Sequence, residues 1–138
     1  VGEHFRPIEM TVFGDWVFEA GDGRMYFLDL LEGEFKPIAA SHADFTERRA
    51  AYLDVCYLVD WVEACLARGL VPKSGQCLGY RIAPVLGGPF EVDNVKVFDL
   101  SVYQSIMGQI HRQIKELPDG ATIEGLTVDG RKINDAAQ

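Results

Sequence analysis

The first forty residues alternate short apolar runs with turn clusters, the pattern of an antiparallel sheet. Residues 11–19 and 24–30 are rich in aromatic and branched side chains, and the Gly-Asp-Gly cluster at 21–23 between them is a hairpin signal. A third strand is expected over residues 35–39, where Pro37 restricts it to a sheet edge. An antiparallel meander is the simplest assembly of these strands.

The middle of the chain has the pattern of helix. Residues 43–68 contain no glycine or proline, and Gly69 is well placed to end a helix. Ser41 fits the N-terminal cap, with Asp44 as the acid at the third helical position. A break near residues 49–52 would give a short helix followed by a longer one.

The stretch 52–66 is apolar almost all round. Its polar positions are Asp54, Asp60 and Glu63. A helix this apolar is covered on more than one side. We favour a central core helix, because internal packing is the commoner fate of apolar helix faces. The alternative is that one side forms an interface, for example with a second copy of the chain.

The final third begins with strand and turn signals. Residues 78–85 are expected to form a strand that runs into a proline turn. The Leu-Gly-Gly-Pro sequence at 86–89 predicts a tight turn, and residues 94–98 a short strand. We expect the Asn94 amide to cap or bridge this loop.

A second long helix is expected from a cap at Asp99 or Ser101 to about Leu117, with Gln104 completing a capping box from Ser101. Four residues at helical spacing form its buried stripe: Tyr103, Ile106, Ile110 and Ile114. The polar residues Gln104, His111 and Lys115 lie on the other side, which normally faces water.

These elements predict an α+β fold: an antiparallel sheet of about five strands packed against two main helices. The chain has 138 residues, the size of one ordinary domain, so we expect a single α+β domain over 1–138. The tail after about residue 126 is polar enough to be flexible.

The charge balance narrows the classes of partner. The chain carries 21 acidic and 13 basic residues, a formal net charge of −8. This disfavours direct binding to nucleic acid or to anionic membrane and suits a basic partner, although solubility explains acidity equally well. No apolar run approaches the roughly 18 residues of a membrane span, and residues 1–10 lack the apolar core of a signal peptide. We expect a cytoplasmic protein.

The three cysteines, Cys56, Cys65 and Cys77, are an odd number and show no metal-binding spacing. We expect them to be small buried hydrophobic residues in a reducing compartment, with no disulfide and no metal. The glycines near Gly87 match neither a P-loop nor a dinucleotide motif. No nucleophile motif is present either, so we expect a binding protein without cofactors rather than an enzyme.

Two sets of residues are candidates for partner binding. The first is the acidic set, Asp54, Asp60 and Glu63, which would supply charge. The second is a polar surface around Asn94 and His111, next to the Gly-Gly turn. His111 with its basic neighbours equally fits a solvated helix face.

Several segments resemble a known bacterial family. They are Phe13-Gly14-Asp15, residues 22–29, the motif Leu86-Gly87-Gly88 with Asn94, residues 105–113 around Gly108, and residues 117–120. Over residues 11–123 the chain resembles the family typified by the C-terminal domain of type VI secretion immunity proteins that neutralise a DNase effector. The resemblance implies an immunity protein that binds a cognate bacterial toxin, with no catalytic residues to carry over. The alternatives are a small-molecule-binding module near residues 86–88 or a homo-oligomeric interaction domain.

Overall fold

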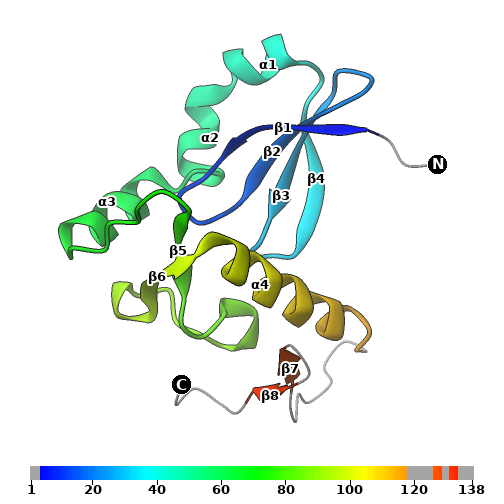
Figure 1. The fold of residues 1–138 in the computed structure, drawn as a ribbon. Helices are drawn as coiled ribbons and strands as arrows, with labels where there is room; N and C mark the ends of the chain where they lie inside the picture. The colour runs from blue at the N-terminus through cyan, green and yellow to red at the C-terminus, as the bar shows by residue number, and fades with distance from the viewer. Residues whose placement is uncertain (1–3, 118–125, 129–130, 134–138) are drawn as a thin grey trace.

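Four strands at the start of the chain form an antiparallel meander in the order β1–β2–β3–β4 (Figure 1). They are β1 (Phe5–Met10), β2 (Trp16–Ala20), β3 (Met25–Asp29) and β4 (Glu34–Ala39). The computed structural model describes residues 4–117, 126–128 and 131–133. The predicted meander is confirmed, with β4 at its edge, and β1 is an additional strand on the opposite edge.

The strand predicted over residues 11–19 begins only at Trp16. Residues 11–15 form a tight turn instead, in which Gly14 has a φ of +84° and its N–H donates to the Thr11 carbonyl at 3.0 Å. The Asp15 carboxylate is buried and accepts the Leu30 N–H and the Thr11 hydroxyl, each at 2.8 Å. Asp15 therefore ties the β1–β2 turn to the end of β3.

Three short helices follow: α1 (His42–Glu47), α2 (Arg49–Val55) and α3 (Val59–Ala67). The Ser41 cap is confirmed, because its hydroxyl accepts the Asp44 N–H at 3.0 Å. Gly69 follows α3 with a φ of +83°. The break predicted near 49–52 lies at Arg48, and a second, unpredicted break covers residues 56–58.

The prediction of a central core helix over residues 52–66 is wrong. In this part of the chain α2 has no buried residue, and α3 buries only Cys65. The covered face of the meander is already filled by Phe45 and Cys56, with the half-buried rings of Tyr52 and Tyr57 beside them. The second break therefore leaves α2 and α3 at the periphery.

A second, two-stranded antiparallel sheet consists of β5 (Gln76–Tyr80) and β6 (Val95–Asp99). The expected strand over 78–85 stops early, because the chain turns into the 3-10 turn η1 (Pro84–Leu86); a second such turn is η2 (Val92–Asn94). The α+β class is confirmed, but the described strands form separate sheets rather than one of five strands. The Leu78 N–H still joins the two regions by donating to the Val12 carbonyl at 2.8 Å.

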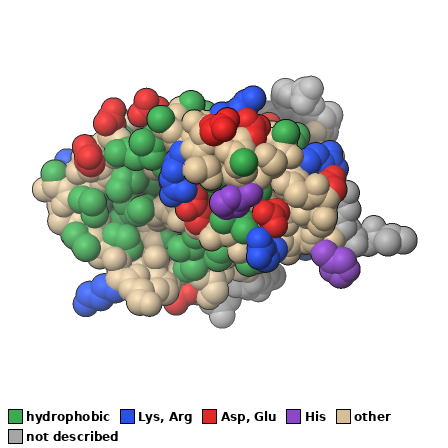
Figure 2. Space-filling model, turned by 90° about the horizontal axis from the view of Figure 1, so that it is seen from above, with side chains coloured by type: hydrophobic (Ala, Val, Ile, Leu, Met, Phe, Trp, Pro, Cys, Tyr) green, Lys and Arg blue, Asp and Glu red, His purple; other side chains and the backbone are tan. Residues whose placement is uncertain are grey.

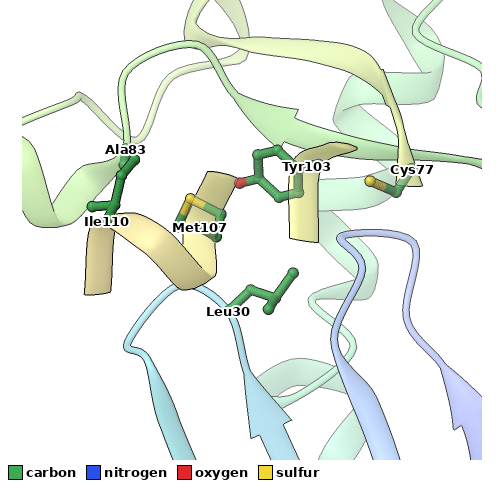
Figure 3. Close-up of a cluster of buried hydrophobic side chains, with 6 residues drawn as sticks. All are labelled: Leu30, Cys77, Ala83, Tyr103, Met107 and Ile110. Atoms are coloured by element: carbon green, nitrogen blue, oxygen red, sulfur yellow. The ribbon is translucent and has the colours of Figure 1, made fainter. Parts of the chain in front are cut away.

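Helix α4 (Leu100–Lys115) is the longest helix of the described residues. Asp99 caps it by accepting the Val102 N–H at 3.2 Å, and Ser101 donates to Asp99, so the predicted Ser101–Gln104 capping box is wrong. Its inward face meets β5 and the η1 turn in one apolar cluster (Figure 3): Leu30, Cys77, Ala83, Tyr103, Met107 and Ile110. Ile106 and Ile114 of the predicted stripe are only half-buried, whereas Met107 is fully buried.

Near the end of the chain β7 (Leu126–Val128) pairs with β8 (Arg131–Ile133), and β7 lies against α4 (Figure 1). The tail after about residue 126 was predicted to be flexible. Part of it, residues 129–130 and 134–138, lies outside the residues that the structure describes. Among the helices of the described residues, none combines the length and apolar character needed to cross a bilayer.

We expect Asp15→Asn to change how stability depends on pH. Burial raises the pKa of Asp15 from 3.8 to about 6, against the opposing hydrogen bonds from Leu30 and Thr11. The folded state therefore holds this proton more tightly than the unfolded chain. The resulting stability is fully present below about pH 4 and is lost as the pH rises through about 6, at most about 3 kcal/mol.

Melting temperatures of both forms between about pH 4 and about pH 7 check this expectation. Asparagine can occupy the same site without a charge. The variant should gain stability relative to the parent chain as the pH rises, and a pH-independent difference would show that Asp15 is not the titrating group.

Candidate partner-binding surface

Helices α2 and α3 expose three large apolar side chains. Leu53 is 41% exposed, Val55 74% and Leu66 42%. In the view from above, hydrophobic side chains form a continuous area on the left, where α2 and α3 lie in Figure 1, with acidic side chains at its margin (Figure 2). We call the three apolar residues together with Asp54, Asp60 and Glu63 the α2–α3 surface.

The break between the two helices gives this surface its shape. Leu58 has a φ of +54°, and it is the one non-glycine residue with a positive φ in the described part of the chain. Such a conformation is unfavourable for a branched or bulky side chain unless the surroundings hold it. Leu58 packs with Trp61 and Val62 against the cluster that contains Phe13 and Tyr80. The inner side of α3 is thereby fixed, and its outer side stays exposed.

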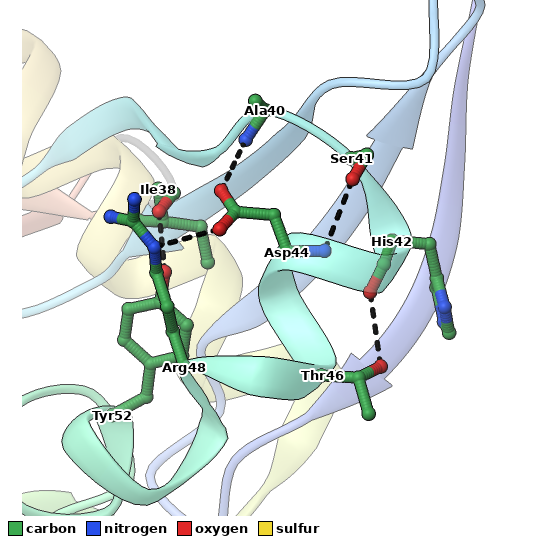
Figure 4. A network of polar contacts seen from close by, with 8 residues as sticks. All are labelled: Ile38, Ala40, Ser41, His42, Asp44, Thr46, Arg48 and Tyr52. Carbon is green, nitrogen blue, oxygen red and sulfur yellow. Dashed lines mark hydrogen bonds and ion pairs between the residues drawn. The ribbon is translucent and has the colours of Figure 1, made fainter.

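Polar contacts fix α1 and the start of α2 relative to β4 (Figure 4). Asp44 accepts the Ala40 N–H at 2.9 Å and the Arg48 guanidinium at 2.8 Å. One turn further on, the Tyr52 hydroxyl donates to the Ile38 carbonyl at 2.5 Å. These bonds orient a helix that has little burial of its own.

A second set of contacts ties both ends of α2 to β1. The Glu9 carboxylate accepts a hydrogen bond from the Arg49 guanidinium at 3.0 Å and another from the Tyr57 hydroxyl. Arg49 also lies over the Phe45 and Tyr57 rings, 5.9 Å from each centroid. Glu9 therefore positions the helix that carries Leu53 and Val55.

The charges of this region are unbalanced. Arg48 pairs with Asp44 at 2.8 Å, Arg49 with Glu9 at 3.0 Å, and Arg68 with Asp93 at 2.5 Å. The three acids of the α2–α3 surface are exposed, and none of them forms an ion pair with any residue that the structure describes. Among the described residues, the negative charge of these three acids is therefore not compensated by an ion pair.

Asn94 of the second candidate set lies inside the 82–94 loop. Its side-chain oxygen accepts the Ile82 N–H at 3.0 Å, and its nitrogen donates to the carbonyls of Ile82 and Pro89 at 2.9 and 3.0 Å. A Cβ atom at Gly88 would lie 1.8 Å from the Ile82 oxygen, and Gly87 has a φ of +92°. Asn94 is buried and uses its amide to hold this loop closed.

Leu86 and Gly108, which belong to the segments that resemble the family, lie in different surroundings. Leu86 packs against the α4 cluster. Gly108 is exposed on α4, and a Cβ atom there would meet nothing within 4 Å. Nothing in the structure explains a glycine at position 108.

His111 and Gln104 do not form the solvated face predicted for α4. The Nε2 atom of His111 lies 2.7 Å from the Leu30 carbonyl oxygen, and a Cβ at Gly33 would come within 2.4 Å of its ring. Gln104 donates to the Gly14 carbonyl at 3.0 Å. The prediction failed because α4 lies beneath the turns of the meander, which need donors for their free carbonyls.

The candidate residues thus fall into two groups. Asp54 on α2 and Asp60 and Glu63 on α3 are exposed, whereas Asn94 and His111 are engaged within the fold. The contact between Glu9 and Tyr57, which are 48 positions apart, was not predicted from the sequence. A contact over that separation leaves no periodic signal in a single sequence.

The family model of the T6SS immunity protein Tdi1, C-terminal, matches residues 40–111, slightly more than half of the chain. The chain belongs to this family. The resemblance found over residues 11–123 is confirmed as to family, over a shorter range. Among curated proteins, none matches this chain. The matched segment runs from α1 into α4 and contains the whole α2–α3 surface, whereas β1–β4 precede it.

We expect Asn94→Ala to lower the free energy of unfolding by about 2–4 kcal/mol, because it strands several buried backbone groups of the loop. Urea denaturation measures this loss. The adjacent Asp93→Ala is the matched control: Asp93 is exposed and makes one surface ion pair, so its removal should cost at most about 1 kcal/mol. Equal losses in the two variants would contradict the structural role of Asn94.

Proposed function

We propose that this protein is an immunity protein that binds its cognate toxin through the α2–α3 surface and blocks it without chemistry of its own. The observation that carries the proposal is the set of exposed apolar residues and uncompensated acids on α2 and α3, inside the segment that matches the immunity family. Exposed apolar patches with a polar rim are typical of protein interaction sites.

The apolar residues and the acids of the α2–α3 surface contribute differently to binding. Burial of Leu53, Val55 and Leu66 under a partner supplies affinity, because apolar area leaves water. The acids around them supply specificity and speed, since complementary charges orient the approaching partner and raise the association rate. The contacts of Glu9 and Tyr52 keep α2 in place before binding, which lowers the ordering cost.

The charge of the surface indicates a basic toxin. A nuclease is the class that fits, because an enzyme that holds phosphates needs a basic groove. The net charge of −8 adds long-range attraction to such a protein. The acids of the α2–α3 surface would then contact the basic residues that otherwise face nucleic acid.

The state of the three thiols fits a role in binding rather than catalysis. Cys56, Cys65 and Cys77 are buried free thiols, and burial raises the pKa of each, that of Cys77 to about 11. Thiols in this state are poor nucleophiles at neutral pH.

We expect Asp54→Lys with Glu63→Lys to weaken toxin binding by roughly tenfold or more, mainly through a slower association rate. Both sites are exposed, and neither side chain makes an ion pair or a hydrogen bond to another described residue. Calorimetry or surface plasmon resonance with the purified toxin measures affinity and rates. Growth of cells that express the toxin together with each variant reports neutralisation.

The matched control is Glu32→Lys with Glu116→Lys. It changes the net charge equally at two exposed sites outside the α2–α3 surface. This control should lose only the small long-range attraction and still protect cells. Equal losses in the two pairs would argue against the α2–α3 surface, and a parent chain that neither binds the toxin nor protects cells would refute the immunity function itself.

A further inference from the structure

The meander has a second apolar surface on the side away from α1 and α2. Cross-strand pairs place Trp16 opposite Leu28 and Phe18 opposite Tyr26, and Phe35 opposite Leu28 on the next strand. The alternate positions Val17, Met25 and Phe27 pack on the other face of the sheet, against Phe45. We call the aromatic residues of the outer side the aromatic sheet face: Phe5, Trp16, Phe18, Tyr26 and Phe35.

The five rings of this face pack on one another. Phe5 lies 5.4 Å from Tyr26 and 5.1 Å from Phe35, and the Tyr26 and Phe35 rings stack at 5.1 Å. Within the described part of the chain, their ring contacts are with one another. Phe5 stays 36% exposed and Phe35 44% exposed. The cluster is therefore ordered but incompletely covered.

The aromatic sheet face carries almost no charge. The ion pairs Arg6–Glu19 and Lys36–Asp29 belong to the alternate positions of the strands, which point to the opposite side. Arg24 stands at the border, 5.6 Å from the Tyr26 ring centre, and is neutralised by Asp22 at 2.6 Å. This neutrality contrasts with the uncompensated acids of the α2–α3 surface.

Charge decides which apolar surface can meet a copy of itself. A two-fold interface brings the same patch of both subunits together, so a charged patch repels its own copy. Two α2–α3 surfaces would oppose like charges from Asp54, Asp60 and Glu63. Two aromatic sheet faces would oppose only rings and aliphatic groups, even in a chain with a net charge of −8.

The two edge strands of the meander favour face-to-face contact between copies over edge-to-edge pairing. β1 contains Pro7 next to an irregularity in its pairing with β2, and β4 contains Pro37. Proline lacks the N–H that strand pairing needs, so sheet extension from either edge is disfavoured. Two meanders can still stack face to face, with side chains interdigitating across about 10 Å.

We propose that a second copy of this chain covers the aromatic sheet face, in a two-fold dimer with the two meanders stacked. Of the five aromatic residues of this face, only Phe5 and Phe35 are exposed, so little apolar area is left for a second copy to bury. The dimer is therefore weak and forms at high protein concentration. Both α2–α3 surfaces stay free for other partners, and the dimer does not depend on the proposed function.

Sedimentation velocity from low to several hundred micromolar protein tests the dimer. The parent chain should shift from monomer to dimer across this range. Phe35→Lys should weaken association by at least about tenfold, because it places an unpaired charge within the apolar interface of both copies. Leu66→Lys, a change of the same kind on the α2–α3 surface, should leave the dimer intact or strengthen it.

A second measurement leaves the face unaltered. In a Trp61→Phe chain, Trp16 is the remaining tryptophan, and its emission should move to shorter wavelength as dimer forms. A parent chain that stays monomeric at all concentrations would overturn the proposal, and so would a dimer that Leu66→Lys abolishes and Phe35→Lys does not. A monomeric chain whose Phe35→Lys variant loses toxin binding would assign this face to the toxin instead.

Discussion

Helix α4 joins parts of the chain that lie far apart in sequence. Its inward side fills the apolar cluster with Cys77 and Ala83, and its other side gives hydrogen bonds to the turns of the meander. Gln104 reaches Gly14 across 90 positions, and His111 reaches Leu30 across 81. The turn carbonyls thereby gain partners without water, and Asp15 satisfies the neighbouring Leu30 N–H. The meander and the β5–β6 sheet are held together through this helix.

This arrangement explains the position of the middle helices. α4 closes one end of the meander, and Phe45 with Cys56 covers one sheet face. Within residues 52–66, the buried side chains are those of Cys56 and Cys65. The break at Leu58 lets Trp61 and Val62 turn inward while Val55 and Leu66 stay outside. Exposed apolar residues grouped on two neighbouring helices fit the partner-binding role that we propose for them.

The sequence predicted the features that depend on local chemistry. The meander, the Ser41 cap, the stop at Gly69 and the Asn94 bridge each rest on a few adjacent residues, and the structure contains all of them. The predictions that were wrong depend on contacts between residues far apart in the sequence. A single sequence does not show that Gln104 has Gly14 as partner, or that most apolar residues of the 52–66 segment stay outside the core. For the candidate surface, the acids were found from polarity alone, whereas the exposed Val55 and the Glu9–Tyr57 contact required the structure.

Hydrogen exchange with and without the toxin tests the central claim most directly. α2 has no buried residue, so its amides should exchange readily in the free protein. We predict that toxin binding slows exchange in residues 53–67 and leaves the centre of the meander unchanged. Protection confined to other segments, with α2 and α3 unaffected in a saturated complex, would contradict the assignment of the α2–α3 surface as the toxin-binding site.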